Sequence, residues 1–215
     1  MSQTNPLQSS AMKQRIITVS GYKGGVGKST TAIHLAAYFS QKGKTVLIDG
    51  DPNRSAVTMA ARGGFPFELG DERQLAKLIQ GREFVIIDTA ARPHSDDLIE
   101  LAKGCDLMIL PVTPSMMTAD PTLLLIKHLQ TLKHIRANYR ALVTIIPPPP
   151  SRDGEAMREE LKSADIPVFE TMIRRRSVYE KAVIKGKPLS MFVEAKAVIA
   201  WDEFIVLGKE IEGIL

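Results

Sequence analysis

A glycine-rich segment at residues 21–30, GYKGGVGKST, constrains this chain more than any other feature. It lies between an apolar stretch typical of a strand, at residues 16–20, and an amphipathic stretch typical of a helix, at residues 29–42. Glycines let backbone N–H groups turn inward around a phosphate, and the N-terminus of the following helix adds donors and a positive dipole. The segment therefore predicts a loop that cradles phosphate.

Two side chains of this loop have the chemistry to hold a nucleotide and its metal. Lys28 is placed to reach the β and γ phosphates, and the Ser29 hydroxyl is placed to bind Mg²⁺. The spacing departs from the generic G-x-x-x-x-G-K-[ST] pattern, because Tyr22 stands where the first glycine would fall and Gly21 comes one residue early. A turn that only connects strand to helix is the alternative, and the strand–loop–helix context disfavours it. ATP with Mg²⁺ is the expected ligand of a cradle made by Lys23, Gly24, Gly25, Val26, Gly27, Lys28, Ser29 and Thr30.

Three aspartates end predicted strands near this loop. Asp49 ends the stretch 45–49 and Asp51 comes two residues later, and Asp88 ends the β-prone stretch 84–88. Carboxylates at the carboxyl ends of parallel strands lie in the crevice where ligands bind. Asp88 has the position of a carboxylate that holds Mg²⁺ through water. Each aspartate alone could merely cap a turn, but three together beside a phosphate loop favour a metal and catalytic role.

The alternation of strand and helix patterns predicts an α/β fold. We expect a doubly wound, mainly parallel sheet with helices on both faces. The predicted strands are residues 16–20, 45–49, 84–88, 107–112, 141–146 and 168–173. The predicted helices are residues 29–42, 71–80, 121–132, 155–162, 178–185 and 197 to the end. Residues 1–14 are polar and are predicted to be a flexible tail, with a single domain over residues 15–215.

Composition excludes several classes of protein. Of 215 residues 44% are hydrophobic and 24% charged, which is ordinary for a soluble globular protein. No apolar stretch approaches the roughly 18 residues that a membrane span needs. The lone cysteine, Cys105, cannot form an intrachain disulfide and is expected to be a small buried side chain in a cytoplasmic protein. The net charge is only +4, so the place of the positive charge matters more than its sum.

Four segments together resemble the ParA/MinD group of deviant Walker ATPases. They are residues 23–29 (KGGVGKS), in which a second lysine precedes the glycines, residues 49–52 (DGDP), residues 86–88 (IID) and residues 111–115 (PVTPS). The resemblance runs from about residue 15 to the end of the chain. It is greatest for the small ParA proteins, which lack an N-terminal DNA-reading domain.

This resemblance implies catalytic roles for three residues and a metal site. In such proteins two ATP molecules are held between two protomers, so Lys23 is expected to reach the partner's phosphates in an ATP-bound homodimer. Asp51 would position the attacking water, which makes Lys23, Lys28 and Asp51 the predicted catalytic residues, and Ser29, Asp51 and Asp88 the predicted metal site. Residues 53–55 (NRS) differ from the Gln-Gly-Asn of many members. Hydrolysis is expected to be slow and to be stimulated by an adaptor protein.

A local basic window suggests a nucleic-acid partner. Residues 171–189 contain six cationic side chains and one acid, Glu180, whereas the whole chain carries only +4. Such a patch is typical of phosphate binding, so we expect nonspecific DNA binding by the ATP form and association with the nucleoid. A solvated charged surface is the alternative. The cargo is either a plasmid or a protein compartment such as a carboxysome. The predicted DNA-binding residues are Arg174, Arg175, Arg176, Lys181, Lys185 and Lys187.

Three other activities occur on this kind of fold. A MinD-like, membrane-cycling ATPase needs a basic amphipathic C-terminal helix, but residues 201–215 carry four acids and one lysine, so no membrane partner is expected. An electron-transfer ATPase resembling the nitrogenase iron protein needs more cysteines than one per chain. A small-molecule ATP-dependent ligase remains an alternative function. Pro147 and Pro148 end a strand and are predicted either to contact the adenine or to form a simple turn.

Overall fold

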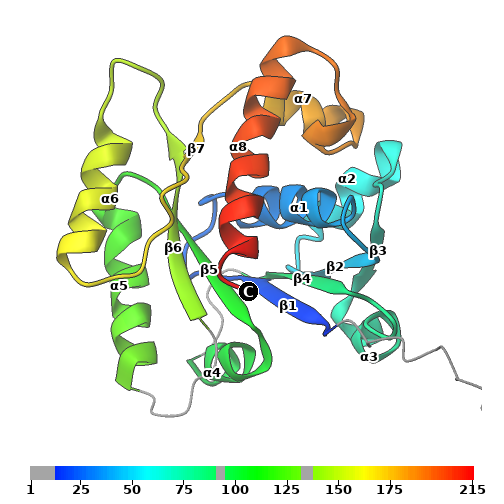
Figure 1. Ribbon diagram of the computed structural model, residues 1–215, viewed down its shortest axis with the longest axis horizontal. Coiled ribbons are helices and arrows are strands. Elements are labelled where there is room, and N and C mark those ends of the chain that lie inside the picture. The colour runs from blue at the N-terminus through cyan, green and yellow to red at the C-terminus, as the bar shows by residue number, and fades with distance from the viewer. Residues whose placement is uncertain (1–12, 91–94, 132–137) are drawn as a thin grey trace, which may run out of the picture.

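A seven-stranded parallel sheet forms the centre of the molecule. The structure, a computed structural model, describes residues 13–90, 95–131 and 138–215, and the predicted tail therefore falls outside it except for Lys13 and Gln14. The strand order is β3-β2-β4-β1-β5-β6-β7, and all pairings between these strands are parallel (Figure 1). The strands are β1 (Arg15–Val19), β2 (Thr45–Gly50), β3 (Glu68–Asp71), β4 (Phe84–Thr89), β5 (Leu107–Val112), β6 (Asn138–Ile146) and β7 (Ile173–Arg174).

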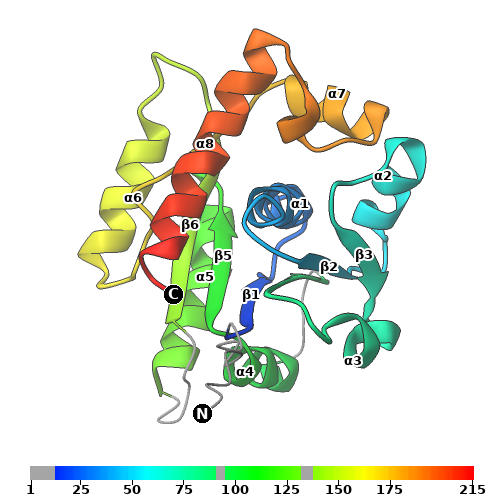
Figure 2. The same cartoon turned by 45° about the vertical axis from the view of Figure 1, so that its right-hand side comes forward.

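Helices cover both faces of this sheet. Alternate residues of each strand point to opposite faces, so Ile17 of β1 joins the core under α1 and α8, while Ile16 faces the other side. Figure 2 shows α1 along its axis, between the strands and α7. The helices are α1 (Lys28–Phe39), α2 (Ser55–Gly63), α3 (Leu75–Leu78), α4 (Ser95–Gly104), α5 (Met116–Thr131), α6 (Asp153–Ser163), α7 (Val178–Lys185) and α8 (Ala195–Glu212), with 3₁₀ turns η1 (Glu72–Gln74) and η2 (Leu189–Met191). The predicted doubly wound α/β fold is confirmed.

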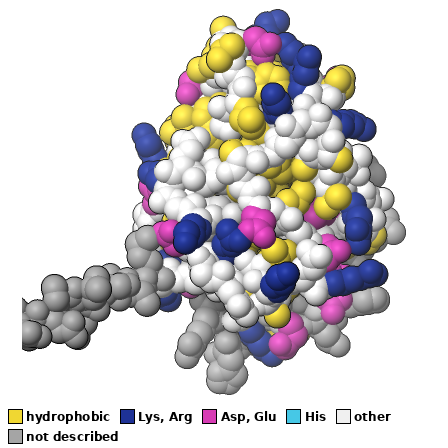
Figure 3. All heavy atoms as spheres, turned by 90° about the vertical axis from the view of Figure 1, so that its right-hand side faces the viewer, with side chains coloured by type: hydrophobic (Ala, Val, Ile, Leu, Met, Phe, Trp, Pro, Cys, Tyr) yellow, Lys and Arg dark blue, Asp and Glu magenta, His cyan; other side chains and the backbone are white. Residues whose placement is uncertain are grey.

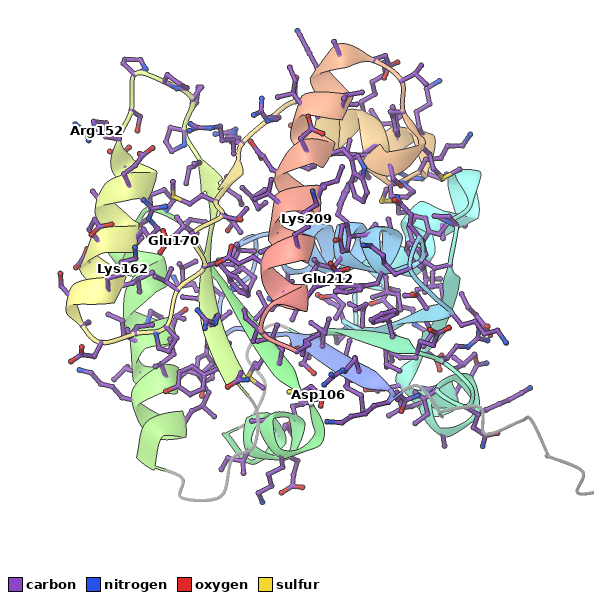
Figure 4. The ribbon with its side chains drawn as sticks, viewed as in Figure 1. Asp106, Arg152, Lys162, Glu170, Lys209 and Glu212 are labelled. Atoms are coloured by element: carbon purple, nitrogen blue, oxygen red, sulfur yellow. The ribbon has the colours of Figure 1, made fainter. Side chains whose placement is uncertain are left out.

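The strand predicted at residues 168–173 is mostly wrong. Only a single bridge from Val168 to Ala141 and the two residues of β7 pair with the sheet. The N–H groups of Glu170 and Thr171 instead donate to the Glu210 carboxylate of α8, at 2.8 and 3.1 Å. Figure 4 shows Glu170 beside Lys162 of α6, and their charged groups lie 2.7 Å apart. The backbone N–H groups that would have paired within a sheet therefore donate to a carboxylate of α8. The apolar pattern of residues 168–173 carries no information about that distant acceptor.

The helix predicted at residues 71–80 is also wrong in part. Asp71 ends β3, and its carboxylate accepts the Arg73 N–H to start the 3₁₀ turn η1, so only one turn of α-helix follows as α3. Strand β3 and helices α2 and α4 were not predicted at all. Helix α5 begins at Met116, with Pro121 inside it rather than at its first turn.

The remaining packing agrees with expectation. Cys105 is a free, buried thiol whose pKa is raised to about 11, chiefly by burial. Among the described residues no helix combines the length and apolar character of a bilayer span. Glu212 at the end of α8 pairs with Lys42 after α1, so part of the acidic character of this helix fastens it to the domain (Figure 4).

Candidate nucleotide-binding site

The glycine-rich loop is shaped by two residues with left-handed backbone. Gly25 and Gly27 have φ of 76° and 88°, values that cost a side-chain-bearing residue free energy. Helix α1 begins directly after Gly27, with Lys28 as its first residue. Helical side chains tilt toward the N-terminus of their helix, so Lys28 points back toward the loop. Its ammonium donates to the Lys23 carbonyl at 2.9 Å. The predicted loop therefore folds around the ammonium of its own lysine.

Thr144 holds this loop against the sheet. Its hydroxyl contacts two carbonyl oxygens, those of Val26 at 2.8 Å and Val112 at 3.1 Å. The loop is therefore tied to the ends of β5 and β6, which come more than 80 residues later in the chain. Thr144 was not among the predicted site residues, because a threonine near the end of a strand carries no local signal of such a contact.

Lys28 and Asp88 form the electrostatic centre of the site. Both side chains are buried, at 5% and 0% exposure. Burial lowers the pKa of Lys28, and the charges of Asp88 and Asp51 oppose that shift. Burial raises the pKa of Asp88 to about 7, which nearby Asp49 and Asp51 reinforce, whereas Ser29 and Lys28 act against it. Both charged groups are buried, so each needs a partner of opposite charge or a hydrogen bond.

Asp49 and Asp51 have different partners. The Asp49 carboxylate is buried and accepts the N–H groups of Ala56 and Val57, each at 3.1 Å, and that of Asp51 at 3.2 Å. It therefore starts α2 and fixes the turn that carries Asp51. The Asp51 carboxylate accepts the backbone and side-chain N–H groups of Asn53, at 2.8 and 2.9 Å. Asp51 lies close enough to Lys28 to shift its pKa, so it shares the predicted site.

A cavity of about 300 Å³ opens beside the loop. Its walls come from the start of α1, from Thr144 and Ile145 of β6, and from residues 173–180. Ile145 has φ of 54°, a left-handed conformation that is strained for a β-branched residue. Strain of this kind is typical of binding sites. Pro147 and Pro148 are not among the residues that line this cavity, so their adenine contact stays a prediction.

The donor set fits a nucleotide with Mg²⁺. Neither carboxylate oxygen of Asp88 has a hydrogen-bond partner of normal geometry among the described residues, although the side chain is fully buried. A buried carboxylate without a partner is costly, so a hydrated cation is the group that suits it. Ser29 would bind the metal directly, Asp88 would hold its waters, and residues 23–30 would surround the phosphates. Bound Mg²⁺·ATP would supply the transferable phosphoryl group.

The predicted DNA-binding residues separate into two groups. Three of them, Arg174, Arg175 and Arg176, line the cavity beside the loop, and Arg176 also pairs with Glu203 at 2.6 Å. The other three lie on or just after α7. In the view of Figure 3 basic side chains are spread over the face, and some of them lie at the top among apolar ones. Among the described residues no carboxylate lies within 4.0 Å of the charged groups of Arg175, Lys185 and Lys187.

Comparison with known proteins places the chain in a family. Residues 17–189 match the model of the CobQ/CobB/MinD/ParA nucleotide binding domain. The chain belongs to this family. It is 31% identical over 179 residues to the maintenance of carboxysome distribution protein A of Gloeobacter kilaueensis, with 80% of this chain and 82% of that protein covered.

Solved structures share the fold of this family member. The ATP complex of a Cyanothece McdA variant superposes with a TM-score of 0.73 and 17% identity, covering 94% of this chain and 97% of the other. The septum site-determining protein MinD of Pyrococcus horikoshii, complexed with Mg-ADP, superposes with a TM-score of 0.68 and 18% identity. The match covers 94% of this chain and 98% of that protein. The resemblance to the ParA/MinD group is therefore confirmed, and these two neighbours are nucleotide-bound proteins of the same architecture.

Proposed function

We propose that the chain is an ATP-hydrolysing ATPase of the ParA type that dimerises with ATP, binds nonspecific DNA and positions a cargo. The observation that carries this proposal is the different state of the two loop lysines. Lys28 is buried and bonded within the protomer. The Lys23 ammonium has no hydrogen bond or ion pair with a described residue, so it is free to approach phosphates on a second protomer. A second cation there would neutralise developing charge only after association.

The relatives support a protein compartment as the cargo. Two of them, from Gloeobacter kilaueensis and Halothiobacillus neapolitanus, are named for carboxysome distribution. Matches to Soj and ParA proteins cover a smaller part of this chain. We therefore favour a carboxysome-like compartment over a plasmid, with an adaptor protein that links it to the ATPase and stimulates hydrolysis. The protein would be cytoplasmic, on the nucleoid when it holds ATP.

The test compares the two lysines. The wild-type protein should sediment as a dimer with Mg²⁺·ATP and mainly as a monomer with ADP. Lys28→Ala should lose nucleotide binding, because the buried ammonium is the direct phosphate ligand. Lys23→Ala should keep ATP binding and lose both the dimer and turnover. A Lys23→Ala protein that dimerises and hydrolyses ATP like wild type contradicts the cross-protomer role.

A further inference from the structure

A second cavity, of about 380 Å³, lies between α1, α2 and α7. It shares only two lining residues, Thr30 and Tyr179, with the cavity beside the loop. The Ser29 side chain, predicted to bind Mg²⁺, lines it at the start of α1, and Arg62 lines it at the end of α2. Ser29 is half-buried whereas Arg62 is exposed, so the cavity is lined both by a predicted metal ligand and by a solvent-exposed arginine.

The chemistry of its walls suits an anion. The lining contains no carboxylate. It contains one guanidinium, that of Arg62, together with hydroxyl or amide groups that can donate hydrogen bonds. The first turn of α1 contributes Ser29 and Thr30, and the N-terminus of a helix favours negative charge. The residues that matter here are Ser29, Thr30, Asn53, Ser55, Thr58 and Arg62.

Arg62 has spare donors. One of its terminal nitrogens, Nη1, donates to the Val183 carbonyl of α7 at 3.3 Å. The rest of its guanidinium has no hydrogen bond or ion pair with any residue that the structure describes. A planar guanidinium with free N–H groups is well matched to the oxygens of a phosphate.

The walls are held in place by two glycines. Gly63 at the end of α2 and Gly186 after α7 meet backbone to backbone. A Cβ on Gly63 would overlap the Lys185 carbonyl oxygen, and one on Gly186 would come within 2.5 Å of the Gly63 nitrogen. Position 186 also favours glycine because its φ is 65°, in the left-handed region. The two helices are therefore fixed around the cavity by close contact at their ends.

We propose that this cavity binds a tetrahedral oxyanion, the inorganic phosphate that ATP hydrolysis releases, on its way from the loop to solvent. The inference rests on the proposed ATPase activity, which supplies the phosphate. Phosphate would leave the region of Ser29, meet the hydroxyls of Ser55 and Thr58, and reach the guanidinium of Arg62. This path differs in most of its lining from the cavity beside the loop, so ADP can stay bound while phosphate departs.

Equilibrium dialysis with radiolabelled inorganic phosphate tests the proposal. The protein is first loaded with Mg²⁺ and a non-hydrolysable ATP analogue, which fills the loop through its γ position. Wild type should then show saturable phosphate binding. Arg62→Gln should weaken it about ten-fold, because a charge-assisted hydrogen bond is lost. Arg62→Lys should keep most of the affinity. Arg73→Gln, which removes the same charge from another exposed arginine, should leave it unchanged.

Three results would overturn the inference. If the analogue binds but wild type takes up no phosphate, the cavity is not a phosphate site, and the proposed ATPase function is untouched. Equal phosphate affinity in Arg62→Gln and Arg73→Gln also overturns it, because the ion then binds elsewhere. If the analogue itself does not bind to the loop, the proposed function fails and the inference fails with it.

Discussion

At the scale of single residues, the three strand-end aspartates have three different tasks. Asp49 accepts three backbone N–H groups and organises the turn after β2. Asp51 bonds Asn53 at the surface of that turn. Asp88 is buried without a hydrogen-bond partner of normal geometry among the described residues, which suits a carboxylate that binds a cation. The sequence predicted that all three lie at one edge of the sheet, but the division of tasks depends on which N–H groups face each carboxylate.

Replacement of Asp49 should therefore damage the fold as well as the activity. Asp49→Ala leaves buried N–H groups of α2 without an acceptor and should lower the free energy of unfolding by about 3 kcal/mol. Asp49→Asn keeps one acceptor oxygen and should cost less. ATP turnover should fall in both variants more than ATP affinity, because the displaced group is Asp51. Thermal unfolding and steady-state kinetics measure this, and unchanged stability in Asp49→Ala would show that the carboxylate does not support α2.

Two other residues show the limit of sequence reasoning at this scale. Arg54 and Ile145 adopt φ of 48° and 54°, where glycine or asparagine is the usual choice. Arg54 starts α2, at the middle position of the segment where many ParA/MinD members carry Gln-Gly-Asn. The residue type does not predict a left-handed backbone at either position. The turn after Asp51 imposes it on Arg54, and the irregular pairing at the end of β6 imposes it on Ile145.

At the scale of elements, His34 joins α1 to the C-terminal part of the chain. Its Nδ1 lies 2.7 Å from the Thr30 carbonyl, and its Nε2 accepts the Leu189 N–H at 3.2 Å. The ring stacks on Phe204 of α8 at 4.6 Å and meets Tyr179 of α7 edge-on at 5.7 Å. An acceptor role for Nε2 needs the neutral ring with its proton on Nδ1. Burial accordingly lowers the pKa of His34 to about 4.

This histidine should make the fold sensitive to acid. Between pH 6.5 and about 4 the unfolded chain binds a proton at this position that the folded chain excludes, so the contribution of His34 to stability falls as the pH falls through that window. The raised pKa of Asp88 acts in the opposite direction, so the contribution of His34 is the difference between wild type and a variant that lacks the ring. The loss should approach about 3 kcal/mol if the whole shift is expressed. His34→Gln cannot titrate, so its free energy of unfolding should depend less on pH there. Denaturant unfolding at several pH values measures both slopes, and parallel slopes would refute the assignment.

The contact between α2 and α7 makes a second prediction about elements. A methyl group on Gly63 meets backbone oxygen, which cannot move without separating the two helices. Gly63→Ala should therefore lower stability by about 1–3 kcal/mol, as overpacking does. Gly104→Ala at the end of α4 is the matched control, because a Cβ there meets nothing within 4 Å. Thermal unfolding compares the two, and equal melting temperatures would show that the helices adjust freely.

Elements with long periodic patterns were the predictable part of the fold. Most of α1, α7 and α8 and the strands β2, β4 and β5 follow the predicted ranges, because each is a long amphipathic stretch or a continuous apolar run bounded by polar or turn residues. Failures fall where a distant residue decides. The Glu210 carboxylate accepts the N–H groups of residues 170 and 171, and the short β3 pairs with β2. Such long-range partners leave no periodic trace in the chain.

At the scale of the whole molecule, ion pairs reduce the charge available to a partner. Arg176 is paired with Glu203 and Lys181 with Glu194, while Arg174 lies 4.0 Å from Glu155. These acids come from α6, α8 and the segment before α8, away along the chain from the cations they meet. The basic window seen in the sequence thus leaves few free cations per protomer. A dimer that joins two such surfaces would bind DNA more firmly than a monomer.

The proposed DNA binding should depend on the free lysines after the middle of α7. Lys185 and Lys187 have no carboxylate within 4.0 Å among the described residues, so they are free to neutralise DNA phosphates. With Mg²⁺·ATP the protein should retain duplex DNA of any sequence, since phosphate contacts carry no sequence information. The double change Lys185→Gln and Lys187→Gln should weaken retention. It should also flatten the salt dependence by about 0.9 in the log–log slope for each phosphate that is no longer neutralised.

The control for this experiment removes the same charge elsewhere. Arg73 and Lys77 are both exposed, on η1 and α3, and Figure 1 shows α3 at the opposite end of the molecule from α7. Changing both to Gln should leave the salt slope unaltered, because the slope depends on the side chains that contact DNA phosphates and these two lie away from α7. Gel shifts at several salt concentrations compare the two double variants. Equal losses in both would mean that only net charge matters, and no retention by ATP-loaded wild type at low salt would exclude the DNA-binding part of the proposal.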